Sequence, residues 1–379
     1  MDDRFNIRDY GAVRGAGAVN TKAIQQAIDA CSAAGGGMVY CPPGLFVTGT
    51  VWLKSGVALY LEAGCVLRGS PDREDYEEPA FPENAAFTRE RVSAAHLIVG
   101  YRAENVAILG RGRIDGNGRA FMPFLTPEGE TAGLPRQWEW RPGQMVFLCR
   151  CRNVQVKGVE LTDSPYWTLF LHGCEDVKVR GVSIRNPIGT PNGDGIDVDC
   201  CRDVAIESCH ISSGDDCITL RANTAPLGDE PRPCENVAVT NCTLRTRCNA
   251  IRVGVGAGTI RDAVFSNLVI RDSTIGVNVV SRYSGMRDGV DIRRVRFADM
   301  VIDAGMPIYV STGADGKAPV ADIGFSNIEA RGTAACFIGG MVDNPVERIT
   351  VRDLDLTVRG GENNHEPAED FTGNPEWTF

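Results

Sequence analysis

The chain has 379 residues, of which 43% are hydrophobic and 23% are charged, a composition typical of a globular protein. Its formal net charge of −10 at pH 7 argues against a nucleic-acid partner. It also lacks the run of about 18 apolar residues that predicts a membrane span. The negative electrostatic field of the whole protein disfavours a polyanionic substrate, although a local cluster of arginines could still bind one.

The cysteines and the first residues bear on the cellular compartment. Fourteen cysteines are scattered through the chain without the spacing of a zinc site, so we expect small buried core residues and no metal or cofactor. Met1–Phe5 has no apolar segment of the kind that a signal peptide contains. Unless a signal was removed, we expect a cytoplasmic protein with reduced thiols.

The first regular element is an amphipathic helix within an N-terminal cap region, residues 1–40. Between Thr21 and Cys31, alanines occupy one helical face, and isoleucines with Cys31 occupy the neighbouring face. Gly35–Gly37 predicts the end of this helix. Such a helix can cover the open end of a repeat protein, which would otherwise expose its core and strand edges.

A repeated strand follows, in which a polar residue precedes alternating apolar positions. From Asn153 onward the copies are 23–33 residues apart, without the 3.6-residue stripe of a helix. A leucine-rich repeat is the nearest alternative, but its fixed leucine pattern is missing. We therefore expect an all-β chain that forms a parallel β-helix. The copies begin at Asn105, Asn153, Asp176, Asp203 and Asn236, with degenerate copies at Asp262, Asp291, Asp322 and Arg348.

Two segments interrupt or end the repeat. Residues 116–142 lack periodicity and carry Phe121, Phe124, Trp138 and Trp140, so we expect a long loop insertion whose exposed aromatics stack on sugar rings. A flap that serves only stability is the alternative. The polar residues 360–379 predict a loosely ordered tail. We see no linker, so we expect one domain over residues 1–379.

Carboxylates gather between residues 192 and 216. Asp194 lies in the sequence NGDGID, and Asp215 and Asp216 lie in SGDDC. Adjacent coils of the repeat should bring these three side chains together, and their repulsion should raise at least one pKa. Separating an acid from a base in this way suits glycosidic cleavage. We interpret Asp197 and Asp199 as turn residues.

These segments give the chain a family resemblance. Over residues 4–355 it resembles the polygalacturonases, glycoside hydrolase family 28. The segments that carry the resemblance are Phe5–Ala12, Gly35–Gly44, Ser164–Thr168, Asn192–Gly195 (NGDG) and Gly214–Cys217 (GDDC). The resemblance implies a right-handed parallel β-helix of the pectin-lyase-like type and inverting hydrolysis by three aspartates. It assigns Asp215 as the general acid, and Asp194 and Asp216 as the pair that activates water.

The chain departs from the family pattern at two places. Asn249 stands where the family has a histidine, and Asn278 and Val280 stand where it has the arginine and lysine that bind a galacturonate carboxylate. Neutral amides give up the bidentate carboxylate binding of arginine. Besides Asn249 and Asn278, other side chains could read the substrate instead: Arg252, Arg282, Arg221 and His172.

We expect a glycoside hydrolase that acts, from the chain end, on pectin-derived or other plant oligosaccharides. The same hydrolysis of a neutral, non-galacturonate glycoside is one alternative. A calcium-dependent lyase and a catalytically idle carbohydrate-binding β-helix are alternatives of other classes. We expect no nucleic-acid or membrane partner, and the sequence leaves the oligomeric state open.

Overall fold

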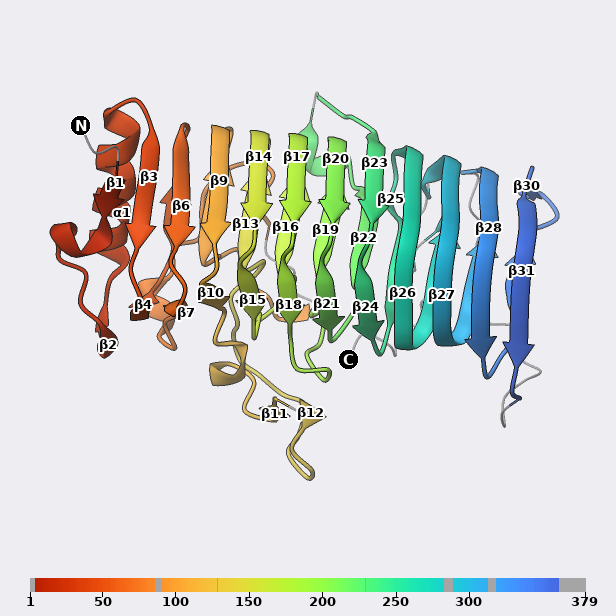
Figure 1. Cartoon of the computed structure of the whole chain (residues 1–379), viewed down its shortest axis with the longest axis horizontal. Coiled ribbons are helices and arrows are strands. Elements are labelled where there is room, and N and C mark those ends of the chain that lie inside the picture. The colour runs from red at the N-terminus through yellow and green to blue at the C-terminus, as the bar shows by residue number, and fades with distance from the viewer. Residues whose placement is uncertain are drawn as a thin grey trace. The chain divides into compact units, whose positions relative to one another are not determined.

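Short parallel strands make up most of the molecule (Figure 1). The computed structural model describes residues 4–85, 90–127, 129–228, 230–282, 289–312 and 318–360. The chain divides into two compact units, Met1–Gly193 and Asp194–Phe379. The organisation as one domain stays a prediction, and all but the first residue of the predicted tail lies outside the described residues.

Three stacks of parallel strands build the first unit, and the chain visits them in turn. The first stack is β1 (Arg4–Asn6), β3 (Gly37–Cys41), β6 (Val57–Leu61), β9 (Glu104–Gly110), β14 (Arg152–Lys157) and β17 (Glu175–Arg180). The second is β2 (Gly15–Val19), β4 (Gly44–Thr48), β7 (Cys65–Gly69), β10 (Arg113–Asp115), β15 (Glu160–Thr162) and β18 (Ser183–Arg185). The third is β5 (Val51–Leu53), β8 (Ile98–Tyr101), β13 (Val146–Cys149) and β16 (Leu169–His172). This order is that of a parallel β-helix, as predicted.

The second unit repeats the same plan with longer strands. Its early strands are β19 (Ile196–Asp199), β20 (Arg202–Glu207), β21 (His210–Ser213), β22 (Ile218–Ala222), β23 (Cys234–Thr240), β24 (Thr243–Thr246) and β25 (Asn249–Gly256). β26 (Thr259–Val280) then pairs with β23, β24 and β25 in succession, so this one strand forms a whole turn. The later strands are β27 (Asp291–Ser311), β28 (Val320–Gly332), β29 (Phe337–Gly339), β30 (Val346–Glu347) and β31 (Thr350–Val358).

Alternating residues divide each strand between the interior and the outer face. In the second unit, Ile196, Ile218, Ile251 and Val277 are partners on successive strands, and all four are fully buried. Rows of this kind fill the β-helix, because each apolar side chain packs on the equivalent residue of the next coil. The neighbouring outward row carries the polar residues of the candidate site.

The polar residue that begins each repeat sits at a bend in the backbone. Asn153 and Asp203, like the equivalent residues of other coils, adopt left-handed φ angles of 52° and 58°. Asparagine and aspartate tolerate this conformation better than other non-glycine residues, which explains the repeat. One predicted copy is wrong: Asp291 pairs with Thr259, and Arg294, with φ 54°, occupies the bend.

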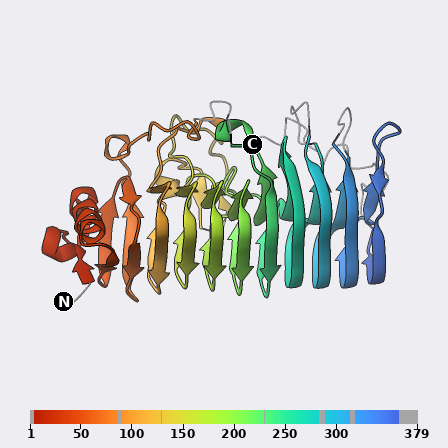
Figure 2. The ribbon, with the colours of Figure 1, turned by 90° about the horizontal axis from the view of Figure 1, so that it is seen from above.

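The predicted N-terminal helix is confirmed as α1 (Thr21–Ala33), beside the first strands of its unit (Figures 1 and 2). Its buried residues are Ala23, Ile24, Ala27, Ile28 and Cys31, the expected apolar face. The described residues also form the short helical turns η1 (Ile7–Tyr10), η2 (Arg73–Asp75), η4 (Gly118–Ala120) and η5 (Ala225–Leu227). Within the described ranges, no helix has the length and apolar character needed to cross a membrane.

The predicted insertion, residues 116–142, contains η4 and the antiparallel hairpin β11 (Leu125–Thr126) and β12 (Gly129–Glu130). Its aromatics do not all face outward. Trp138 is 8% exposed, stacks on Phe124 at 6.0 Å and lies under the Arg141 guanidinium at 4.6 Å. Trp138 is therefore part of a small core inside the loop, and its expected role as an exposed stacking surface is wrong. Trp140 is half-buried and packs edge-on against Phe121.

All 14 cysteines have free thiols, and 12 of them are buried. This agrees with their predicted place as small core residues. The two that are half-buried are Cys248 and Cys336.

Candidate active site

The predicted aspartates lie at the ends of neighbouring strands in the second unit. Asp194 comes just before β19, and Asp215 and Asp216 come just before β22. The backbone N–H of Gly195 donates to the Asp216 carbonyl at 2.8 Å. The N–H of Cys217 donates to the Asn249 carbonyl at 3.0 Å. The strand pairing therefore brings Asp194, Asp216 and Asn249 to one edge of three successive coils.

Glycine is required between the two acidic segments. A Cβ atom at Gly195 would lie 2.4 Å from the carbonyl oxygen of Cys217, which is far inside van der Waals contact. Only glycine lets the Asp194 segment approach the next coil this closely. The NGDG sequence is thus explained by packing as well as by chemistry.

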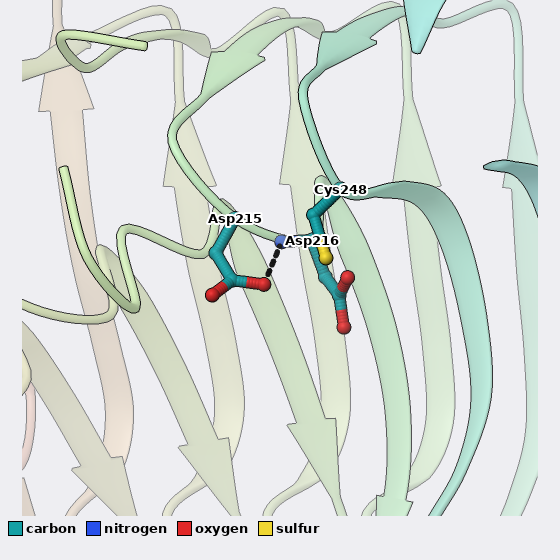
Figure 3. Close-up of side chains that lie close together, drawn as sticks. All are labelled: Asp215, Asp216 and Cys248. Carbon is teal, nitrogen blue, oxygen red and sulfur yellow. Dashed lines mark hydrogen bonds between the residues drawn. The ribbon is translucent and has the colours of Figure 1, made fainter. Parts of the chain in front are cut away.

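Asp215, Asp216 and Cys248 form the centre of the site (Figure 3). The Asp215 carboxylate accepts a hydrogen bond from the Asp216 N–H at 2.9 Å, and one ligand atom of each side chain lies within 4.8 Å of the other two. Hydroxyl groups of Ser213 and Thr246 donate to the Asp215 carbonyl and fix its backbone. Two carboxylates and a thiol could hold a metal ion, so the absence of a metal stays a prediction.

Burial and mutual repulsion hold protons on this cluster. Burial, reinforced by the Asp216 charge, raises the pKa of Asp215 to about 6. Burial also raises the pKa of Asp194 well above its usual range, with further contributions from Asp197, Asp215 and Asp216. Burial and the Asp215 charge likewise raise the pKa of the Cys248 thiol. A carboxyl that retains its proton near neutral pH can act as a general acid.

Asp197 and Asp199 are not turn residues, because both lie in β19 with almost no exposed surface. Asp197 pairs with Arg221 at 2.8 Å, and the same guanidinium lies 4.0 Å from Asp194. Burial raises the pKa of Asp197 to about 7, despite the opposing charge of Arg221. The alternation of Asp197 with Ile196 and Val198 was the signal for a strand that the motif-based interpretation overlooked.

Asn249 and Asn278, which depart from the family pattern, and Arg252, a candidate substitute for the missing cations, form a chain of contacts that begins at Asp216. Asn249 Nδ2 donates to Asp216 Oδ1 at 2.6 Å, and Asn278 Nδ2 donates to Asn249 Oδ1 at 2.8 Å. The Arg252 guanidinium lies 3.7 Å from Asp216 Oδ2. The structure thus brings together Asp194, Asp215, Asp216, Asn249, Arg252, Asn278 and Arg221, all within the second unit.

Two candidates remain, one in each unit. His172, in the first unit, is 1% exposed and stacks on Phe170 at 5.6 Å, so it is a packed core residue that does not reach a cleft. Arg282, in the second unit, lies two residues after the end of β26 and is half-buried, and its role stays a prediction. Sequence reasoning also missed the fully buried Arg141, which donates to Asn192 Oδ1 at 2.8 Å just before Asp194 in the chain.

Comparison with known proteins finds a matching family model and several relatives. Residues 80–227 match the model of glycosyl hydrolases family 28. A probable polygalacturonase of Vitis vinifera is 28% identical over 286 residues, 72% of this chain and 56% of that protein. An exo-poly-alpha-D-galacturonosidase of Dickeya chrysanthemi is 27% identical over 317 residues, 73% of this chain and 52% of that protein. The chain thus spans about half the length of these two relatives.

The fold is also that of solved structures. A hyperthermoactive exopolygalacturonase from Thermotoga maritima has a TM-score of 0.71 with 22% identity, covering 94% of this chain and 92% of that one. The polygalacturonase from Erwinia carotovora ssp. carotovora has a TM-score of 0.71 with 19% identity, covering 96% of this chain and 95% of that one. The family model over residues 80–227 and these relatives support membership of glycosyl hydrolase family 28.

Proposed function

We propose that the protein hydrolyses O-glycosidic bonds in pectin-derived oligosaccharides. The observation that carries this proposal is the group of Asp194, Asp215 and Asp216 at adjoining strand ends, with the pKa of Asp215 raised to about 6. The printed names of the relatives, a polygalacturonase and an exo-poly-alpha-D-galacturonosidase, support the substrate class. The second name also supports action from the chain end.

In the proposed mechanism, the proton on Asp215 passes to the oxygen of the leaving sugar as the glycosidic bond breaks. Asp194 and Asp216 hold a water molecule on the opposite face of the sugar ring, and Asp216 takes its proton as it attacks. This division requires one carboxyl that keeps a proton and one that accepts one. Attack from the opposite face inverts the anomeric centre.

The function is tested by digesting a panel of pectic oligosaccharides with the parent protein and with Asp215→Asn and Asp194→Asn variants. We expect each substitution to lower kcat by about 10³-fold or more, since loss of general acid–base catalysis alone costs about 10² to 10⁴. Asp203→Asn is the matched control, because Asp203 is an exposed bend residue with φ 58° that asparagine tolerates. NMR of the first product should show the inverted anomer.

Three results would contradict the proposal. Full activity of both aspartate variants would show that Asp194 and Asp215 do not take part in the reaction. A product that absorbs in the ultraviolet and that disappears with a chelator would indicate a calcium-dependent lyase instead. Binding of the glycan panel without turnover would indicate the idle carbohydrate-binding β-helix.

A further inference from the structure

The connection between β21 and β22, which carries Asp215 and Asp216, has a counterpart in the next coil between β24 and β25. β21 pairs with β24, and β22 begins its pairing with β25 at the same offset in the sequence. That offset takes Asp215 to Cys248 and Asp216 to Asn249. Because successive strands lie about 4.8 Å apart, the register places Cys248 and Asn249 beside the two carboxyl groups.

Thr246, the last residue of β24, ties the backbone of Cys248 to that of Asp215. The Thr246 hydroxyl accepts the N–H of Cys248 at 3.1 Å and donates to the Asp215 carbonyl. Thr246 has no exposed surface, so water does not compete for these two hydrogen bonds. The two connections are therefore held together by their backbones, whatever their side chains do.

The Cys248 thiol contacts the side chains on both sides of the proposed reaction. Asn249 Nδ2, which donates to Asp216 Oδ1 at 2.6 Å, also donates to Cys248 Sγ at 3.3 Å. Cys248 Sγ and a carboxylate oxygen of Asp215 lie within 4.8 Å of each other (Figure 3). One amide and one thiol thus connect Asp216 with Asp215.

The thiol is the donor in its contact with Asp215. Its sulfur already accepts an Asn249 N–H, so its single proton is free to point to the carboxyl. Burial raises the pKa of Cys248, and the charges of Asp215 and Asp216 add to this, so the thiol keeps its proton. Burial and the Asp216 charge raise the pKa of Asp215, whereas its hydrogen bond with Cys248 acts against them.

A second donor matters to Asp215 because its carboxyl group can otherwise turn. The terminal torsion of an aspartate side chain has a broad energy minimum. Asp215 Oδ1 accepts the N–H of Asp216 at 2.9 Å, which favours the proton on Oδ2 but leaves the carboxyl plane free to rock about this one contact. A donor from the next coil restrains that plane.

We propose that Cys248 is a positioning residue for the general acid: its thiol, held by the Asn249 amide, donates to the Asp215 carboxyl and fixes the orientation in which that carboxyl presents its proton to the leaving oxygen. This inference rests on the proposed hydrolysis and adds a residue to its machinery. Asn249 thereby holds Asp216 directly and Asp215 through Cys248.

The kinetic test compares Cys248→Ala, Cys248→Ser and Cys336→Ala on a pectic oligosaccharide that the parent protein cleaves. Cys248→Ala removes the donor, so kcat should fall about 3- to 10-fold, the equivalent of one ordinary hydrogen bond, with KM little changed. Cys248→Ser keeps a donor and should restore most of kcat. Cys336 is the other half-buried cysteine, and its loss should leave both constants unchanged. A residue that served only folding would lower the yield of folded protein and not kcat per folded molecule.

A second measurement does not depend on hydrolysis. Alkylation by iodoacetamide at pH 8, followed by mass spectrometry of the two peptides, compares how readily the Cys248 and Cys336 thiols react. Asp215→Asn removes a charge that disfavours the Cys248 thiolate, so it should speed alkylation of Cys248 several-fold and leave Cys336 unchanged. If no oligosaccharide is cleaved but Cys248 responds in this way, the result supports the thiol–carboxyl contact and counts against the proposed hydrolysis alone.

Three results would overturn the inference. The first is a parent value of kcat in Cys248→Ala, and the second is a loss in Cys248→Ser or Cys336→Ala as large as that in Cys248→Ala. The third is an alkylation rate of Cys248 that does not change in Asp215→Asn, because the thiol would then not face this carboxyl.

Discussion

The second unit contains Arg–Asp pairs in two settings, and the settings have opposite effects on the acid. At the outer bends, Arg294 donates two hydrogen bonds, of 2.6 and 2.8 Å, to the Asp262 carboxylate. These hydrogen bonds lower the pKa of Asp262. In the site, Arg221 pairs with Asp197 at 2.8 Å, yet the pKa of Asp197 rises to about 7.

Burial explains the difference. The side chain of Asp262 is 37% exposed and Asp197 is fully buried, so only Asp197 loses the water that stabilises its charge. The exposed ion pairs at the bends therefore connect neighbouring coils with little desolvation penalty. The buried ion pairs of the site contain acids whose raised pKa values let them exchange protons near neutral pH. An ion pair seen in this fold indicates chemistry only where both partners have left the solvent.

The largest expected effect comes from removing the buried cation. Arg221→Met leaves Asp197 without a counter-ion and also removes the guanidinium near Asp194, so we expect a loss of about 3 kcal/mol in the free energy of unfolding at pH 8. Arg294→Met at the exposed bend should change stability far less, and Arg221→Lys should recover part of the loss. Urea denaturation measures all three. Equal losses in the two methionine variants would contradict the role assigned to burial.

The fold could be predicted from the sequence because particular residue types identify the bends between strands. Asparagine and aspartate mark the left-handed positions, and alternation marks the strands, so the coils could be counted from residues alone. The three aspartates were also located, because adjoining coils must bring equivalent strand ends together. The exception is Arg294: neither asparagine nor aspartate marks this left-handed position, and the nearby Asp291 was taken for it.

The rest of the site depends on contacts that no local pattern contains. The orientation of the Asn249 and Asn278 side-chain amides depends on the Asp216 carboxylate oxygen, which accepts a hydrogen bond from Asn249 on another strand. Trp138 is buried because its loop forms a small core with Phe124. Asp197 was misread because a DxD segment beside glycines resembles a turn. In each case a hydrogen bond or a packing partner far along the chain decides the outcome.

The second prediction concerns stability against pH, where the two settings should differ in sign. Asp197 binds its proton more tightly when folded, so stability from this group is present below its ordinary pKa of about 4 and is lost as pH rises towards 7. Asp262 behaves in the opposite way: its contribution is present above pH about 4 and is lost as pH falls through its lowered pKa. Asp197→Asn should therefore flatten the decline in stability between pH 5 and 7, and Asp262→Asn should leave that range unchanged. Denaturation midpoints at each pH measure this, and a flattened decline in Asp262→Asn alone would contradict the comparison.

The smallest expected effect tests the other buried cation. Arg252 lowers the pKa of Asp215, as the least of several influences behind burial and Asp216. Arg252→Gln should therefore raise that pKa, which keeps the general acid protonated to higher pH and moves the alkaline limb of kcat/KM upward from about pH 6. The pH profile on a pectic oligosaccharide that the parent protein cleaves measures this, with Arg245→Gln as the control, because Arg245 is exposed and pairs with Asp272. An alkaline limb that moves downward, or that moves equally in both variants, would show that Arg252 does not act on Asp215. If the limb moves upward in Arg252→Gln and stays in place in Arg245→Gln, then the charge of Arg252 acts on the general acid directly.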